Sequence, residues 1–149
     1  MKIRDVMSYN PTRIDVDATM QRAAEVVSLT QVSDLMVTDS DNHFIGVLSE
    51  GDLIRAVMPK FDEIMQGGGS LREAFDMFIE NGRTVAIKPI SSIVIGRSDL
   101  VIVHPDDEVL KAAGSMVSRQ IRRLPVVNAD GKLVGTVSRA DVCRGILHT

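Results

Sequence analysis

GVLSEGD at residues 46–52 and GTVSRAD at residues 135–141 are two copies of one pattern, Gly-x-x-Ser-x-x-Asp. In each copy an apolar run passes through the serine and the aspartate into a helix-forming stretch. The two aspartates, Asp52 and Asp141, lie 89 positions apart. A long internal repeat indicates a chain built from copies of one supersecondary unit. The sequence therefore predicts one unit built twice.

The match extends well beyond the motif when the shift of 89 is kept without a gap. The apolar, polar and charged positions of the two halves then coincide along most of their length. The matched pairs include Asp17 with Asp106, Gln31 with Gln120, Leu35 with Leu124, Val37 with Val126, and Arg55 with Arg144. The predicted organisation is a first repeat at 1–58, a connection at 59–90, and a second repeat at 91–149.

The amino-acid composition is typical of a globular protein. Its 149 residues are 44% hydrophobic and 25% charged, with a net charge of −3, and a chain of this length buries about 70% of its unfolded surface. The N-terminal residues lack the apolar run of a signal peptide, and no window is long enough to span a membrane. Cys143 is the only cysteine, so it is expected as a buried structural thiol in a cytoplasmic protein.

Apolar periodicity predicts the same element order in both repeats: strand, helix, strand, strand, helix. For the first repeat we expect a strand starting at 11–14, a helix through 20–27 capped by Asp17, strands at 35–38 and 44–48, and a helix from Glu50. For the second we expect a strand at 100–103, a helix capped by Asp106 or Asp107, strands at 124–127 and 133–137, and a helix from Arg139 to the end.

The connection between the repeats carries signals of its own. Pro59 should end the preceding helix, and 67–69, three glycines, should form a flexible break. The capping-box pattern at 70–73 starts a predicted helix at 70–81, with Gly82 as its C-terminal cap. Its apolar stripe at 71–79 suits a helix that covers the core. The alternative is a helix that binds a partner or dimerises, because three of the four phenylalanines fall in this connection.

The repeated motif also carries chemistry. A helix start offers free N–H groups and a dipole that favour an anion. Ser49 and Ser138 can add hydroxyl donors, while Asp52 and Asp141 can accept hydrogen bonds from a vicinal diol. Together these groups describe a site for a ribose phosphate. The alternative is that serine and aspartate are helix caps and nothing more.

The two repeats resemble cystathionine β-synthase (CBS) domains, and the pair resembles a Bateman module without an attached effector domain. The resemblance rests on LPVV at 124–127 and on the two Gly-x-x-Ser-x-x-Asp segments. It implies an α/β (α+β) fold of two pseudo-symmetric β-α-β-β-α repeats packed face to face. It also implies an adenosine nucleotide (AMP, ADP or ATP) bound in a cleft between the repeats.

Carried over by position, the resemblance assigns two clefts. In the first, ribose and phosphate would meet Ser49, Gly51 and Asp52, adenine would lie against Leu100, Val101, Ile121 and Pro125, and the phosphates would meet Arg122 and Arg123. The second would use Ser138, Ala140 and Asp141 with Thr12, Val32 and Met36. Its phosphate positions are Ser33 and Asp34, and Met36 replaces the family's proline. The first cleft is therefore the expected nucleotide site.

Other classes of function lack supporting residues. The three histidines have no second ligand at metal spacing, no triad spacing is present, and no Walker-type loop occurs. We therefore expect neither a catalytic nor a metal site, and a protein that is not an enzyme. The acidic total charge and 3% aromatic content argue against nucleic acid. S-adenosylmethionine as ligand, and a structural dimerisation module with a vestigial site, stay open as alternatives.

Partners follow from the same resemblance, since CBS pairs associate through their helices. We expect a homodimer with Met20, Met58 and the stripe at 71–79 as candidate contacts. Large apolar patches seldom stay exposed. The output of a ligand-sensing module without an effector domain would pass through another protein chain, whose identity the sequence leaves open.

Overall fold

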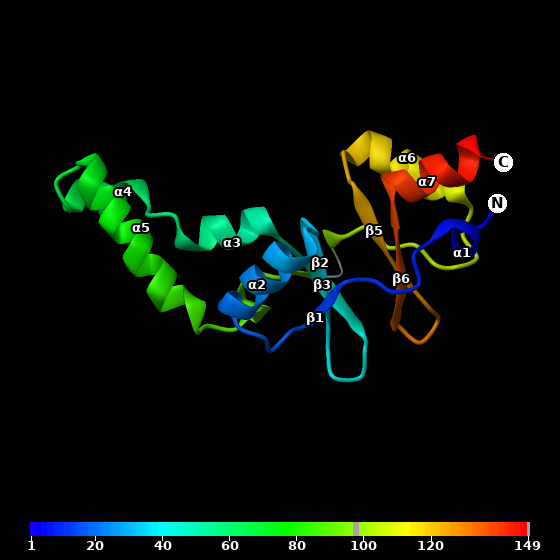
Figure 1. The fold of residues 1–149 in the computed structure, drawn as a ribbon, viewed down its shortest axis with the longest axis horizontal. Helices are drawn as coiled ribbons and strands as arrows, with labels where there is room; N and C mark the ends of the chain where they lie inside the picture. Colours follow the sequence, from blue (N-terminus) through cyan, green and yellow to red (C-terminus); the bar gives the residue numbers. More distant parts are fainter. Residues whose placement is uncertain (97–98, 149) are drawn as a thin grey trace. The chain divides into compact units, whose positions relative to one another are not determined.

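The computed structural model describes residues 1–96 and 99–148 (Figure 1). Thr149, the last residue of the predicted final helix, lies outside the described residues. The chain forms two compact units, which we call the first and second unit and describe separately. The first unit comprises Met1–Asp15, Met36–Val47 and Ile95–Thr149, and the second comprises Val16–Leu35 and Leu48–Val94.

The units do not follow the two sequence repeats. The second unit holds the helices of the first repeat and of the connection: α2 (Met20–Thr30), α3 (Glu50–Val57), α4 (Phe61–Gln66), α5 (Leu71–Ala86) and η1 (Ile90–Ser92). The first unit holds α1 (Ile3–Val6), β1 (Arg13–Asp15), most of β2 (Asp34–Thr38) and β3 (Phe44–Ser49), β4 (Ile95–Gly96), α6 (Val109–Arg119), β5 (Arg123–Val127), β6 (Leu133–Ser138) and α7 (Arg139–Leu147). The mixed α/β class expected from the sequence is confirmed.

The strands form two sheets. One has the order β1-β2-β3-β4, with β1 parallel to β2 and β4 antiparallel to β3. The other is the antiparallel hairpin β5–β6, and α6 and α7 lie side by side next to it (Figure 1). The β2–β3 and β5–β6 turns also pair, since Phe44 N–H donates to the Gly131 carbonyl at 2.9 Å.

The hairpin β5–β6 is buried on both faces, which explains its nearly continuous apolar sequence. Leu124 and Val126 point into one cluster, formed with α1 and α6. Val127 and Leu133 belong to a second cluster with Met36 and Phe44. Side chains alternate along a strand, so each face supplies its own core.

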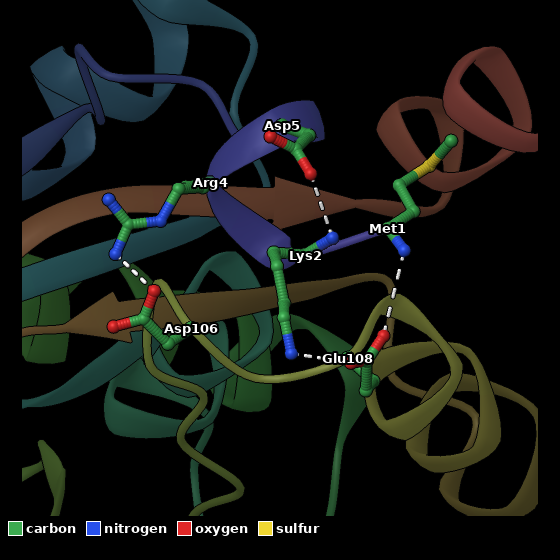
Figure 2. Close-up of polar contacts among 6 residues, drawn as sticks. All are labelled: Met1, Lys2, Arg4, Asp5, Asp106 and Glu108. Atoms are coloured by element: carbon green, nitrogen blue, oxygen red, sulfur yellow. Dashed lines mark hydrogen bonds and ion pairs between the residues drawn. The ribbon is translucent and has the colours of Figure 1, made fainter.

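The N-terminal segment packs on residues of the second repeat (Figure 2). Ile3 is fully buried, its N–H donates to the Asp107 carbonyl at 2.9 Å, and Ser8 pairs with Thr136 through two backbone bonds. Outside this contact, the Lys2 ammonium and the terminal amine face the Glu108 carboxylate, and Arg4 pairs with Asp106. The chain start is thus tied to the start of α6.

An equivalent exchange occurs in the second unit. There Ile90, also fully buried, donates its N–H to the Ala18 carbonyl at 2.9 Å. Met20 N–H donates to the Lys88 carbonyl at 2.9 Å, just as Val109 N–H donates to the Met1 carbonyl at 3.1 Å. The segment before each repeat therefore supplies a backbone carbonyl that accepts from the first N–H of the other repeat's first helix. This bond matters because the initial N–H groups of a helix have no partner within the helix.

Three local predictions were wrong. Thr19, not Asp17, caps α2, accepting from Arg22 N–H at 3.1 Å. Glu108 precedes α6 and gives no side-chain cap, while the Asp107 carboxylate accepts from His104 N–H instead. The strand predicted at 100–103 reduces to one parallel bridge between Val103 and Val126. Thr19 and Asp107 are thus used by residues three positions away, and Val103 by a strand later in the chain.

The connection forms two helices. The helix α3 ends at Val57, as Pro59 predicts, and Ser70 caps α5 by accepting from Glu73 N–H at 3.1 Å. However, α5 does not end at Gly82 but continues to Ala86. The Asn81 side chain donates to the Val57 carbonyl at 3.1 Å, which holds this part of α5 against α3 and keeps it helical.

Cys143 is exposed, contrary to the expected buried thiol. It lies two residues after Asp141, which α7 turns inward and buries. Two positions correspond to about 200° around a helix, so the two side chains point in opposite directions. Across the described ranges, no helix combines the length and the apolar character needed to cross a membrane.

Candidate functional site

The two Ser-x-x-Asp segments fold into the same local structure, a capping box at a strand-to-helix junction. In the second unit, Ser49 N–H donates to Asp52 Oδ2 at 2.8 Å and Asp52 N–H donates to Ser49 Oγ at 3.1 Å. In the first unit, Ser138 and Asp141 make the same two bonds at 2.8 and 3.1 Å. The capping role considered for these residues is therefore real in both copies.

The second oxygen of each carboxylate meets an arginine three residues later. Asp52 Oδ1 lies 2.5 Å from Arg55 Nη2, and Asp141 Oδ1 lies 3.2 Å from Arg144 Nη2. Both carboxylate side chains are only about one tenth exposed. A diol approaching either aspartate would therefore compete with an arginine for Oδ1, while Oδ2 stays in the capping box.

The two arginines are held differently. Arg144 Nη2 also donates to the Val6 carbonyl at 3.1 Å, which ties α7 to α1. The Arg55 side chain is 71% exposed and lies over Gly51, where an added Cβ would come within 3.3 Å of Arg55 Nη1. The matching position in the second repeat is Ala140. The Arg144 side chain is 61% exposed as well, so the two arginines differ in the bond to Val6 and not in exposure.

The predicted phosphate contacts, Arg122 and Arg123, differ in their surroundings. Arg123 is half-buried on β5, and its Nη1 donates to the Thr136 hydroxyl at 3.0 Å. Thr136 is only 1% exposed and faces Pro125 across the hairpin. Arg122 is exposed, and its carbonyl accepts from Arg139 N–H at 3.0 Å. The guanidinium of Arg123 is therefore oriented by the hairpin.

The apolar residues predicted to contact adenine pack against two different core clusters. Val101 and Ile121 pack against the cluster that contains Leu124 and Val126, whereas Leu100 packs against the cluster that contains Met36. Pro125 is buried within β5. Within the first unit these apolar residues therefore do not form one continuous patch.

The residues assigned to the first cleft belong to different units. Ser49, Gly51 and Asp52 lie in the second unit, and the apolar and arginine positions lie in the first. Of the second set, Val32 lies in the second unit and the others, Thr12, Met36, Ser138, Ala140 and Asp141, lie in the first. Met36 is 1% exposed, and its N–H donates to the Thr12 carbonyl at 3.4 Å. It is a core residue.

The β2–β3 turn brings together Asp39, Asp41 and His43, a grouping that the sequence reasoning missed. Their potential ligand atoms lie within 4.8 Å of one another. Asp39 Oδ1 accepts the N–H groups of Asp41 and His43, both at 2.9 Å. The bond from His43 N–H is the main cause of the lowered pKa of Asp39. The Asp-x-Asp-x-His spacing could have revealed the cluster, and these bonds explain it as a turn.

Two α/β repeats with identical Ser–Asp helix starts define a tandem-repeat protein. The family model described as "CBS domain" matches residues 3–59 and 90–148. The chain belongs to this family, as its motifs predict.

Individual relatives agree with this assignment. MJ1225, an uncharacterized protein of Methanocaldococcus jannaschii, is 26% identical over 93% of this chain, which spans only 40% of that relative. The crystal structure of CBSX2 in complex with AMP superimposes on this chain with a TM-score of 0.72 and 24% sequence identity. The match covers 99% of this chain and 96% of the CBSX2 chain. The CBS domain pair of MJ0100, solved in complex with 5′-methylthioadenosine and S-adenosyl-L-methionine, matches with a TM-score of 0.69 and 19% sequence identity. This match covers 99% of this chain and 97% of the MJ0100 chain. At these identities the solved structures establish the fold.

Proposed function

We propose that this protein is a non-catalytic, ligand-sensing module that binds an adenosine nucleotide (AMP, ADP or ATP) and signals its occupancy to another chain. The observation that carries the proposal is the repeated Ser–Asp helix start, with an exposed arginine on each carboxylate and a second bond, to the Val6 carbonyl, at Arg144. The adenosine compounds in the titles of the CBSX2 and MJ0100 structures support this ligand class.

In this proposal, the Asp52 carboxylate accepts hydrogen bonds from the ribose diol. Arg55 must then give up its contact with Asp52 Oδ1. An exposed ion pair contributes only about 0–1 kcal/mol, whereas a hydrogen bond to a charged group contributes about 1.5–3 kcal/mol. The exchange of Arg55 for a diol is therefore favourable at Asp52.

The same exchange costs more at Asp141. Arg144 would have to leave both the carboxylate and the Val6 carbonyl, and that carbonyl would lose its guanidinium donor. In addition, Asp34 puts negative charge where the first set has Arg123. Both effects make the Asp52 set the proposed nucleotide site and the Asp141 set the weaker one.

The remaining contacts are assigned to the second repeat. Leu100, Val101, Ile121 and Pro125 are proposed for the adenine, and the exposed Arg122 and the oriented Arg123 for the phosphates. Charge-assisted hydrogen bonds are roughly twice as strong as neutral ones, so the first phosphate should add to affinity. S-adenosylmethionine and methylthioadenosine form a second candidate class, favoured by their presence in the MJ0100 structure.

A thermal-shift panel tests the proposal. Adenosine, AMP, ADP, ATP, S-adenosylmethionine and methylthioadenosine are each added to the native protein and to Asp52→Asn. A ligand that binds only the folded state raises the melting temperature by mass action. We expect AMP to raise it in the native protein and less in the variant. No shift with any adenosine compound would leave a dimerisation module with a vestigial site.

Signalling requires that the ligand bind two states of the protein with different affinity. We propose that the output passes through a homodimer and from there to a further protein chain. The apolar residues exposed on the helices of the second unit support this assembly. Binding that depends steeply on salt with single-stranded RNA would instead favour a nucleic-acid partner.

A further inference from the structure

The helices α3, α4 and α5 expose an unusual amount of apolar surface. Residues 50–86 are all described, and no side chain of the three helices is fully buried. Large apolar patches on a protein surface mark interaction sites. The large apolar side chains exposed on and beside these helices are Ile54, Met58, Phe61, Met65, Leu71, Phe75 and Ile79.

The helix α5 has two distinct faces. The inner face meets α3, where Asn81 donates to the Val57 carbonyl and Gly82 and Val85 line a groove with Leu53. The outer face carries Leu71, Phe75 and Ile79, which are 87%, 61% and 42% exposed. Residues four apart lie above one another on a helix, so these three form a straight apolar stripe.

We propose that this outer stripe of α5 packs against the same stripe in a second copy of the chain, with the two helices antiparallel about a twofold axis near Phe75. The inference rests on the proposed homodimer and names the surface that forms it. In this arrangement Leu71 of one copy meets Ile79 of the other, and the two Phe75 rings meet at the axis. A twofold interface uses one self-complementary patch on both subunits, as this stripe does.

The charges beside the stripe select the antiparallel arrangement. Arg72 follows Leu71 and Glu80 follows Ile79, and both side chains are exposed. When Leu71 meets Ile79 of the second copy, Arg72 lies beside Glu80 and next to Asp76 of that copy. In a parallel twofold pair the flank that carries Arg72 would instead face the opposite flank of the partner helix, where Ala74 and Phe78 lie. The antiparallel arrangement alone therefore pairs opposite charges across the interface.

Sedimentation equilibrium over about 1–100 μM, without nucleotide, tests the surface directly. We expect the native chain to be a dimer and Phe75→Glu to weaken the dimer at least about tenfold, since a buried unpaired charge is costly. Ile87→Glu is the matched control, because Ile87 is 78% exposed and lies outside the stripe. It should leave the dimer unchanged. Far-UV circular dichroism on each variant checks that α5 still folds.

A charge exchange keeps the test independent of apolar packing. Arg72→Glu and Glu80→Arg should each weaken the dimer several-fold, and the double variant should recover part of the loss, because the pair is re-formed with its signs reversed while Asp76 and Arg83 keep their charges. A native dimer that is indifferent to Phe75→Glu would overturn this surface while leaving the proposed homodimer intact. A native monomer throughout the range would remove both. Nucleotide binding is measured separately and distinguishes either result from failure of the ligand site.

Discussion

Arg123 Nη1 donates a 3.0 Å hydrogen bond to the hydroxyl of Thr136, across the antiparallel pair β5–β6. Thr136 is almost completely buried, so the bond holds one edge of the guanidinium against the hairpin. Arg122, the neighbouring residue, is exposed. Of the two arginines predicted to contact phosphates, Arg123 is therefore oriented by the hairpin and Arg122 is exposed to solvent.

Replacing both arginines with glutamine should separate a phosphate site from a nucleoside site. The change keeps hydrogen-bonding capacity but removes charge, so AMP should bind roughly tenfold or more weakly, because bonds to charged groups contribute about 1.5–3 kcal/mol. Adenosine should be nearly unaffected. Calorimetry with both ligands measures the difference, with Arg119→Gln, an exposed arginine on α6, as control. Equal weakening of both ligands would mean that the arginines support the fold instead.

Asp52→Asn should lower the affinity for AMP by about tenfold or more, because the amide keeps the shape of the carboxylate but loses its charge and one acceptor. Asp141→Asn, the matched variant, should have a much smaller effect, since Arg144 is anchored to Val6 beside it. Calorimetric titration of both variants decides the question. Equal losses of AMP affinity in the two variants would show that Asp52 does not mark the stronger site.

The capping serines should contribute equally to stability even though the two aspartates differ in binding. Ser49→Ala and Ser138→Ala each remove the hydroxyl that accepts an aspartate N–H at 3.1 Å, and each should cost about 1 kcal/mol. Urea denaturation measures the loss. Ser118→Ala, an exposed position within α6, serves as control and should not destabilise the protein.

Ile3→Ala should lower the free energy of unfolding by about 2–5 kcal/mol, because Ile3 is fully buried in the cluster with Val109 and Leu124. Leu29→Ala, at an 80% exposed leucine, should change it by less than about 0.5 kcal/mol. Chemical denaturation compares the two. If Ile3→Ala costs no more than the control, the N-terminal segment is not part of the cooperative fold.

The attachment of the chain start should depend on pH. The hydrogen bond and charge of Lys2 lower the pKa of Glu108, and the same contact raises the pKa of Lys2. The contribution of the pair is therefore complete between about pH 5 and pH 10 and is lost at lower pH, as Glu108 takes up a proton, and again above the raised pKa of Lys2.

A double-mutant cycle measures this contribution. Glu108→Gln, Lys2→Gln and the double variant are compared by urea denaturation at pH 7 and at about pH 3. We expect a small coupling at pH 7, because both side chains are about half exposed, and a smaller one at pH 3, where Glu108 begins to take up its proton. A coupling that is equal at both pH values would contradict the ion pair.

Much of the fold was predictable because the signals are local. The capping boxes at Ser49 and Ser138 depend on residues three positions apart, and the strand at 124–127 depends on an unbroken apolar run. The repeated Ser–Asp helix starts also identified the family that the comparison then confirmed. The assignment of individual ligand contacts remains a prediction, since it joins residues of two separate units.

The tertiary structure decided what depends on residues distant in the sequence. Ile3 and Ile90 are buried, each hydrogen-bonded to the segment before the other repeat's first helix, and no local pattern encodes that exchange. The contact of Asn81 with Val57 extends α5 past Gly82, and the inward turn of Asp141 leaves Cys143 exposed. The anchoring of Arg144 by Val6, which distinguishes the two aspartates, spans almost the whole chain. Local sequence determines which groups are available for hydrogen bonds and burial, and only chain packing determines which partner each one meets.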